Sequence, residues 1–510
     1  MNVKNGINID NKLIVLLAIL SIGLFLRIYD LGGESIWLDE RESVRFASLN
    51  LSDIFFLSER NPPLYNIILH WWINLFGDSE FSIRFPSVIF GSLSIYMMYK
   101  VGNQIFDKNV GILGSLLLGL SVFHIRYSQE ARMYSLSFLL TLLSIYFFIR
   151  FFKNRSCKVL ISYILFSILL MYSHIYGIFI IISQNIYLIV LFFSSKELFR
   201  LNIKRWILTQ SLLIILFIPW IKIFIAQIFG VVKGGFWVPT PSLLSIVKSF
   251  GAYSGGILLF LLFLILLSFS IIKYEGIGNN IDRRNILKSI KSCYRKIRLL
   301  NINDILLLLV WLLTPIILPF TISLFSTPIY TTKYTIVASP AFYLLVAKGI
   351  SNVSHKYLKS TIISIIIIIS LVYVREYYIK IDKEQWRDVA SHIDANAKNG
   401  DLLLFNAYYC QPVFDYYSKR TDLVRDHYSE KNIKRLEATV EGYKRVWVIR
   451  RVQSIHRQVQ QHPWLSKWIL QYSKDEKALI TKKLIETYNL PYQKKYVGIN
   501  IALFERKEHN

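Results

Sequence analysis

The chain has 510 residues, of which 54% are hydrophobic and only 18% are charged, whereas a soluble globular chain carries about 25% charged residues. This composition excludes an ordinary cytosolic enzyme. There are 59 Lys and Arg against 33 Asp and Glu, a formal charge of +26, and the positions of these charges decide whether they indicate nucleic acid, a membrane surface or cytoplasmic loops.

Long apolar runs predict a protein that crosses a membrane many times. A helix needs roughly 20 mostly apolar residues to cross about 30 Å of hydrocarbon, and about eleven such runs appear. In chain order they are 12–28, 86–106, 111–125, 135–152, 159–174, 177–195, 206–226, 252–272, 304–325, 335–351 and 360–379. The first run has no small-residue cleavage site and many others follow it, so we interpret it as a retained helix with a cytoplasmic N-terminus.

The basic residues support this topology. If the chain alternates across the membrane, the inner loops are 107–110, 153–158, 196–205, 273–298 and 352–359. These loops are rich in Lys and Arg, as the positive-inside rule requires. Much of the net charge is therefore an orientation signal, and no nucleic-acid partner is predicted. We expect a multi-pass protein of the cell membrane, surrounded by lipids.

The loop 29–85 on the outer side is too long to be a simple connector, and such loops are usually functional. Its adjacent Asp39 and Glu40 suit an acid–base or metal-assisted reaction on a hydroxyl. Alternatively, one of them only caps the helix that follows. Pro62-Pro63 then precedes a short aromatic helix, 65–76, which we expect to lie flat at the interface; alternatively, the prolines only start that helix.

Two later outer loops also carry charged and aromatic residues. The loop 126–134 places Glu130 between Arg126 and Arg132, and charges beside apolar spans are functional candidates because they are costly there. The alternative is a local structural ion pair. Lys333 and Tyr334 lie in the loop before the tenth run, where they are either functional or ordinary interface anchors.

From residue 380 the chain becomes polar. Helix-like stretches at 384–396 and 462–473 alternate with strand-like stretches at 401–406, 445–450 and 496–505, which predicts a soluble α/β domain over 380–510. An odd number of spans places this domain outside the cytoplasm, after a transmembrane domain over 1–379. Cys157, Cys293 and Cys410 lack the spacing of a zinc site or a disulfide framework.

The outer loops together carry many cations on the same side as several carboxylates. These cations are Arg41, Arg45, Arg60, Arg84, Arg126, Arg132 and Lys333. Such a set suits binding of a lipid-linked phosphate beside an activated nucleophile. A transporter would instead place polar residues in mid-helix. Gln184 and Asn185 are the main candidates for that role, with His174 nearer a span end, and satisfied interhelical hydrogen bonds explain them equally well.

These motifs resemble the GT-C glycosyltransferases related to the dolichyl-phosphate-mannose protein mannosyltransferases and the bacterial lipid A aminoarabinose transferases. The resemblance covers the whole length, and its specific parts are residues 37–40, 61–65, 76–86 and 127–134. It implies a GT-C-like fold and transfer of a sugar from a polyprenyl-phosphate donor to a lipid, protein or glycan acceptor at the non-cytoplasmic face. The implied reaction is a single displacement with inversion of the sugar's anomeric centre. The alternatives are a transporter or flippase of lipid-linked sugars, and a non-catalytic envelope scaffold.

The resemblance also implies roles for single residues. Asp39 would be the base or the carboxylate that orients the acceptor, assisted by Glu40 and Glu130. The residues implied to hold the carrier phosphate are Arg60, Arg132, Lys333 and Tyr334. Further candidates for the substrate cavity are Glu59, Asn61, Arg84, Arg126 and Tyr127.

The sequence departs from its relatives at two of these positions. Many relatives have His where this chain has Asn61, so no role of that histidine carries over to this chain. No cofactor is predicted. Dependence on a divalent metal is left open, because no ligand motif supports one. Lys333 stands where the relatives have Arg. Its ammonium group would bind a phosphate as a point charge, without the two parallel hydrogen bonds that a guanidinium donates. The segment 380–510 has no WWD-type motif, which argues against transfer of a whole glycan to asparagine.

Overall fold

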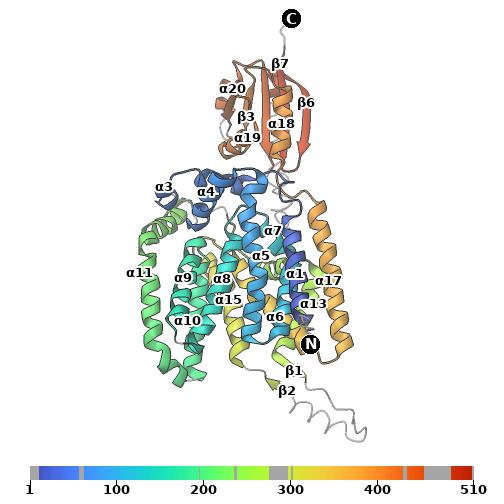
Figure 1. Cartoon of the computed structure of the whole chain (residues 1–510). Helices are drawn as coiled ribbons and strands as arrows, with labels where there is room; N and C mark the ends of the chain where they lie inside the picture. Colours follow the sequence, from blue (N-terminus) through green and yellow to red (C-terminus); the bar gives the residue numbers. More distant parts are fainter. Residues whose placement is uncertain are drawn as a thin grey trace, which may run out of the picture. The chain divides into compact units, whose positions relative to one another are not determined.

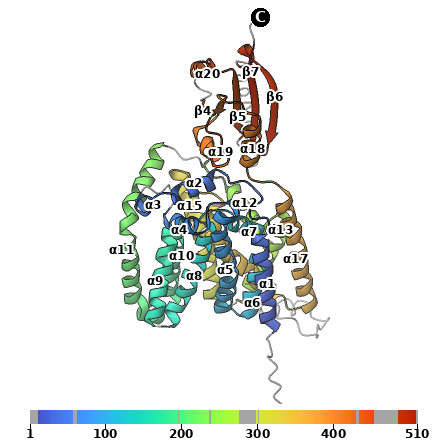
Figure 2. The same cartoon turned by 45° about the horizontal axis from the view of Figure 1, so that its top comes forward.

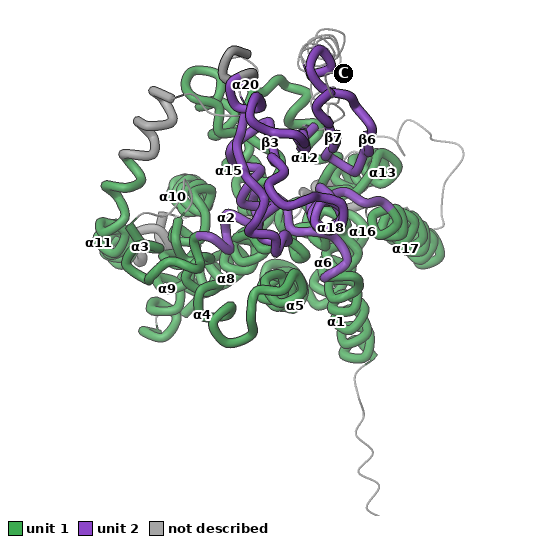
Figure 3. Tube along the Cα trace, turned by 90° about the horizontal axis from the view of Figure 1, so that it is seen from above, with its two compact units in different colours: residues 1–31, 46–379 green, residues 32–45, 380–510 purple. Residues whose placement is uncertain are grey.

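A computed structural model describes most of the chain. The described residues are 11–56, 62–154, 156–194, 196–234, 238–274, 297–299, 302–428, 433–452 and 484–507. They belong to two compact units (Figure 3). The first unit comprises residues 1–31 and 46–379, and the second comprises residues 32–45 and 380–510. Residues 32–45, which the sequence placed in the outer loop 29–85, therefore pack with the C-terminal segment.

The first unit is a bundle of helices. Its long and medium helices are α1 (Asn11–Ile28), α5 (Glu80–Ile105), α6 (Lys108–Gly119), α8 (Tyr134–Lys153), α9 (Cys157–Ser173), α10 (Gly177–Ser194), α11 (Lys196–Gly234), α12 (Leu243–Ser254), α13 (Ile257–Ile271), α15 (Ile302–Phe325), α16 (Ser339–Asn352) and α17 (Lys356–Ile379). Its shorter elements are α3 (Leu51–Phe56), α4 (Leu64–Phe76), α7 (Val122–Ser128), η1 (Tyr334–Ala338), β1 (Ile272–Tyr274) and β2 (Ile297–Leu299). Figure 1 shows α3 and α4 at one end of the bundle and the antiparallel β1 and β2 at the other.

The number of spans agrees with the sequence prediction. By length and composition, seven helices of the described chain are able to cross a membrane, or up to nine when each of two bent pairs counts as one span. Two shorter apolar helices, Cys157–Ser173 and Gly177–Val190, accompany them. Each of the predicted runs overlaps one of these spans, bent pairs or short helices. The protein is therefore a polytopic helical membrane protein.

Short polar side chains begin several of the helices. Ser79 accepts the backbone N–H of Ser82 before α5, at 3.3 Å. Asp107 accepts those of Asn109 and Val110 before α6, at 2.8 and 3.1 Å. These bonds satisfy N–H groups of the first turn that have no carbonyl partner within the helix.

A buried arginine holds one of the two bends. α6 and α7 meet at 65° just after Gly119. The guanidinium of Arg27, which has no exposed surface, donates to the carbonyl oxygens of Leu118 and Gly119 at 3.1 and 3.2 Å and lies 2.9 Å from Nδ1 of His124. Arg27 therefore adds side-chain hydrogen bonds to carbonyls in the last turn of α6, where a positive charge is also favourable.

The second unit contains a mixed five-stranded sheet with helices on both faces (Figure 2). Its elements are α18 (Trp386–Asn396), β3 (Leu402–Phe405), η2 (Tyr408–Cys410), α19 (Gln411–Tyr417), β4 (Val424–His427), α20 (Ile433–Val440), β5 (Arg445–Arg451), β6 (Tyr488–Tyr496) and β7 (Ile499–Arg506), together with most of α2 (Leu38–Ala47). The strand order is β4-β3-β5-β7-β6. β3 is parallel to β4 and β5, whereas β7 is antiparallel to β5 and β6.

The two cores of this unit follow from alternation along β3. Leu402 and Leu404 pack on one face with Leu436 of α20. On the other face, the ring of Phe405 contacts that of Phe414 in α19, with centroids 5.5 Å apart. Alternate side chains of a strand point to opposite faces, so a continuous apolar run fits a strand that is covered on both sides.

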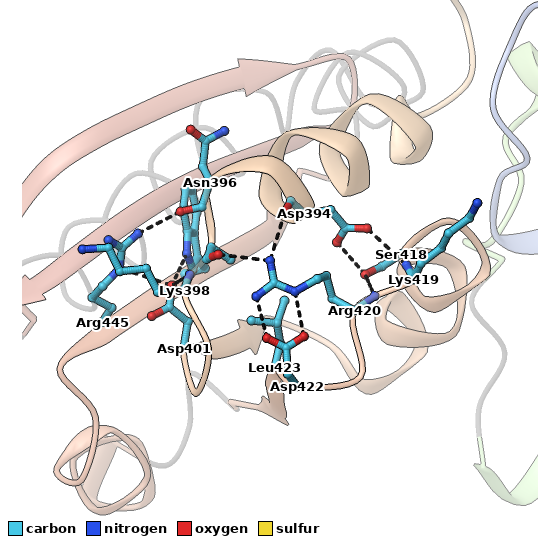
Figure 4. Close-up of polar contacts among 12 residues, drawn as sticks. Asp394, Asn396, Lys398, Asp401, Ser418, Lys419, Arg420, Asp422, Leu423 and Arg445 are labelled. Atoms are coloured by element: carbon cyan, nitrogen blue, oxygen red, sulfur yellow. Dashed lines mark hydrogen bonds and ion pairs between the residues drawn. The ribbon is translucent and has the colours of Figure 1, made fainter.

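A polar network closes the end of α18 (Figure 4). Arg420 donates to the carbonyl oxygens of Asp394 and Ala397 at 3.0 and 3.1 Å and forms a bidentate ion pair with Asp422. Ser418 donates to the carboxylate of Asp394 at 2.6 Å. The last carbonyls of α18 are thus joined to the segment that leads into β4.

The predicted strand 496–505 was wrong in its extent. The chain instead forms a hairpin, with β6 ending at Tyr496 and β7 beginning at Ile499. Gly498 in the connection has φ of 74°, a conformation that favours glycine. The predicted helix 462–473 lies outside the described residues.

Candidate functional site

Asp39 and Glu40 lie in the first turn of α2. The side chain of Asp39 is half-buried, and its carbonyl oxygen accepts a hydrogen bond from the Ser43 hydroxyl at 3.3 Å. Glu40 has no exposed surface, and its carboxylate accepts the backbone N–H of Trp37 at 3.4 Å. The capping contact proposed for this pair is therefore made by Glu40, and both carboxylates suit the positive end of the helix dipole.

Glu40 also forms an ion pair within the second unit. Nζ of Lys383 lies 3.3 Å from Oε1 and 3.4 Å from Oε2 of Glu40, and the side chain of Lys383 is only 10% exposed. Two further hydrogen bonds join residues 32–45 to the C-terminal part of the second unit. Arg41 donates to the carbonyl oxygen of Pro412 at 3.0 Å, and Glu34 accepts the backbone N–H of Asp382 at 2.6 Å. Glu40 and its neighbours Glu34 and Arg41 are thus held by the polar segment that begins at residue 380.

Glu130 and Arg126 form the local pair that the sequence left as an alternative. Arg126, near the end of α7, places Nε 3.7 Å from Oε1 of Glu130, whose side chain is 5% exposed. The turn around Glu130 is anchored by Gln129, which donates to the carbonyl oxygens of Arg27 and Tyr29 at 3.2 and 2.8 Å. The position of this carboxylate is therefore defined by the fold.

Lys333 and Tyr334 lie in a group of aromatic side chains that we call the Lys333 cluster: Tyr134, His174, Tyr176, Lys333 and Tyr334. Nζ of Lys333 lies 5.8 Å from the ring centre of Tyr134 and 5.6 Å from that of Tyr334. The ring centre of Tyr334 lies 4.9 Å from that of His174 and 5.7 Å from that of Tyr176. The cluster joins three segments that the sequence predicted to be outer loops or to border them.

The segment 126–134 continues directly into this cluster. The ring of Tyr127 contacts that of Tyr134, with centroids 4.9 Å apart. Arg132 is buried, and its positive charge and that of Lys333 both act on His174. The first unit thus brings two cations together with aromatic rings and hydroxyls, a combination that suits an anionic group on an apolar chain.

Other predicted site residues lie elsewhere or are not described. Arg84 is buried on α5, where it donates to the carbonyl oxygen of Leu31 at 2.9 Å, a contact that secures the end of α1. Glu59, Arg60 and Asn61 lie outside the described residues. Among the residues that the structure describes, no group of three or more His, Cys, Asp or Glu is arranged to hold a metal ion.

The mid-helix polar residues considered for a transporter are used in interhelical bonds. Gln184 accepts the Tyr163 hydroxyl at 2.6 Å and donates to Ser144 at 2.9 Å. Asn185 accepts the indole N–H of Trp206 at 2.9 Å. The site residues predicted from the sequence did not include Tyr134, His174 or Tyr176. Tyr134 ends the loop 126–134, which holds several selected candidates, whereas His174 and Tyr176 lie at the short connection between two apolar runs, where no site residue was selected.

Comparisons with known proteins agree with this structure. Residues 60–223 match the model of the dolichyl-phosphate-mannose-protein mannosyltransferase family. No curated protein is similar enough in sequence to count as a match. The fold is similar to that of ArnT from Cupriavidus metallidurans in the apo state, with 10% identity, a TM-score of 0.55, and coverage of 96% of this chain and 97% of that chain.

Two further solved structures share the fold. ArnT from the same organism bound to undecaprenyl phosphate matches with 10% identity, a TM-score of 0.54 and the same coverage. The apo oligosaccharyltransferase of Archaeoglobus fulgidus matches with 12% identity and a TM-score of 0.52, over 88% of this chain and 70% of that chain. The predicted GT-C-like resemblance is therefore confirmed, as is the expected membrane fold with a C-terminal α/β domain.

Proposed function

We propose that the protein is an integral membrane glycosyltransferase that moves a sugar from a polyprenyl-phosphate donor to an acceptor hydroxyl at the non-cytoplasmic face, with inversion. The Lys333 cluster is the observation that carries this proposal. It gathers positive charge and aromatic rings at the side of the bundle that the basic loops predict to face outward. The family match over residues 60–223 supports the same reaction class.

The proposed chemistry is a single displacement. The acceptor oxygen attacks the anomeric carbon of the sugar, the bond from that carbon to the phosphate oxygen breaks, and the polyprenyl phosphate leaves. Asp39 takes the proton of the acceptor hydroxyl. Negative charge grows on the departing phosphate, and Lys333 and Arg132 stabilise it there, because cations that the fold already holds in place need little reorganisation. Tyr334 contributes its hydroxyl to the same group.

Release of polyprenyl phosphate tests this function. We would supply purified protein in lipid with a panel of polyprenyl-phosphate sugars and acceptors. Asp39→Asn should lower the release rate by about 10²–10⁴-fold, because it removes the general base and leaves the shape of the side chain nearly unchanged. Asp53→Asn is the matched control, since Asp53 belongs to α3 and pairs with Asn50, and it should turn over at the wild-type rate.

Two results would contradict the proposal. Asp39→Asn protein that releases polyprenyl phosphate as fast as the wild type would remove Asp39 from the chemistry. Wild-type protein that moves the intact lipid-linked sugar across the membrane, without releasing phosphate, would show a transporter.

A further inference from the structure

His174 occupies a short connection inside the first unit. It follows α9 directly, two residues before Tyr176 and three before the start of α10. Its side chain is only 2% exposed and packs in the Lys333 cluster. Its Nδ1 lies 3.0 Å from the backbone nitrogen of Tyr176 and accepts that N–H.

This bond determines where the proton of the ring lies. A nitrogen that accepts a hydrogen bond carries no proton, so the ring is neutral and its hydrogen is on Nε2. Nε2 lies on the opposite edge of the ring and is buried, with no hydrogen-bond partner among the described residues. Buried donors are normally paired, so this N–H needs a partner that the described residues do not supply.

The surroundings of the ring indicate the charge of that partner. Within the described part of the chain, Arg132 and Lys333 act electrostatically on His174, and both are positive. The ring centre of His174 also lies 4.9 Å from that of Tyr334. An N–H donor beside two cations is suited to an oxygen of an anion, and it adds a directed bond without a third positive charge.

We infer that Nε2 of His174 donates a hydrogen bond to the phosphate of the lipid-linked donor and keeps that bond when the phosphate leaves. This inference rests on the proposed function, because it assumes that the Lys333 cluster binds a polyprenyl phosphate. It assigns His174 as a phosphate-binding residue, beside the two cations.

The test compares two lipids that differ only in the phosphate. We would measure the affinity of the full-length protein in lipid nanodiscs for undecaprenyl phosphate and for undecaprenol. His174→Phe keeps a buried ring and removes the donor, so it should weaken binding of the phosphate lipid by about tenfold or more and leave undecaprenol unaffected. His174→Gln retains an N–H donor and should recover much of the loss.

Two control variants separate the possible causes. Lys333→Gln should weaken binding of the phosphate lipid if the Lys333 cluster is the phosphate site. Tyr163→Phe removes a buried hydroxyl from α9 about 16 Å along the helix from His174 and should leave both affinities unchanged. Wild-type protein without preference for the phosphate, or a Lys333→Gln variant that keeps this preference, would overturn the proposed site and the role of His174 together.

Other outcomes overturn the role of His174 alone. If Lys333→Gln loses the preference for phosphate and His174→Phe keeps it, the cations bind the anion without the imidazole. If His174→Phe weakens binding of both lipids equally, the ring only packs the cluster.

Discussion

Asp39 and Glu40 are adjacent in the sequence, but their side chains have different surroundings. Successive residues of a helix point about 100° apart, so the two carboxylates cannot face the same neighbours. Glu40 is fully buried against Lys383, whereas Asp39 is half-buried. We therefore propose that Glu40 positions α2 within the second unit and that Asp39 carries the chemistry.

Substitutions at the Glu40–Lys383 pair separate these roles. Lys383→Met removes the cation of the buried Glu40–Lys383 pair and should destabilise the protein by about 3 kcal/mol, because removing one partner of a buried ion pair is strongly unfavourable. The double variant Glu40→Gln with Lys383→Met removes both charges and should recover most of that stability. Thermal unfolding of the full-length protein measures both effects.

Turnover of the double variant then decides the role of Glu40. A double variant that is stable and as active as the wild type would confirm a positioning role. A double variant that is stable and inactive would assign Glu40 to the reaction, and a single variant as stable as the wild type would contradict the ion pair.

Residue-scale predictions succeeded where a side chain has a nearby partner in the sequence. Arg126 and Glu130 are four positions apart, and the structure shows the local ion pair that the sequence offered as one of two interpretations. His174 was weighed only as a transporter residue, because its neighbours Arg132 and Lys333 come from segments far away along the chain.

At the scale of elements, two helices approach closely at glycines. A Cβ atom on Gly102 of α5 would lie 2.8 Å from the Cα of Gly111 in α6, and one on Gly111 would lie 2.6 Å from the carbonyl oxygen of Tyr99. Both obstacles are backbone atoms, which do not move aside as a flexible side chain does. Small residues at such positions let helices pack in a membrane by van der Waals contact.

Gly102→Ala should therefore separate α5 from α6. We expect a loss of about 1–3 kcal/mol, seen as a lower Tm of the purified protein, because the added methyl group overpacks the interface. Gly114→Ala is the matched control on α6, since the atoms nearest to its Cβ would be side-chain atoms of Leu344 and Met98, at 3.1 and 3.3 Å, and not backbone atoms. Equal Tm values for the two variants would contradict this account of the interface.

Elements were predictable where a local pattern specifies them. Apolar runs predicted the helical spans, and the strand-like stretch 401–406 predicted β3, because hydrophobic length and residue pattern depend on adjacent residues. The bends were missed. The 97° bend between α12 and α13 follows Gly255, which has φ of 81°, whereas we predicted one span over 252–272 although Ser254-Gly255-Gly256 interrupts its apolar residues.

At the scale of the whole molecule, we propose that the N-terminus lies in the cytoplasm and residues 380–510 lie outside it. Labelling of cysteine thiols from either side of the membrane tests this orientation. Cys157 is exposed at the start of α9, in a predicted inner loop. Cys410 is buried, and burial raises the pKa of its thiol to about 12, so the reactive thiolate is scarce at neutral pH. Cys293 lies outside the described residues and would be replaced by Ser.

In this Cys293→Ser protein, a membrane-impermeant maleimide should label Cys157 only after the cells are permeabilised, because the reagent otherwise does not reach the cytoplasm. Tyr408→Cys in the same background creates an exposed thiol in the second unit, since Tyr408 is 71% exposed, and it should react in intact cells. Labelling of Cys157 in intact cells would reverse the topology and place the Lys333 cluster on the cytoplasmic side.

The sequence by itself determined the class of the protein: a polytopic helical membrane chain with a polar α/β segment at its C-terminus. Hydrophobic length, charged loops and short motifs are local properties, and they were sufficient for that conclusion and for the resemblance to GT-C proteins. Only the tertiary structure decided that residues 32–45 pack with residues 380–510 and that His174 joins Lys333 and Tyr334. The physical reason is that burial and hydrogen-bond partners depend on segments that are distant in sequence, and their distances are set only when the chain folds.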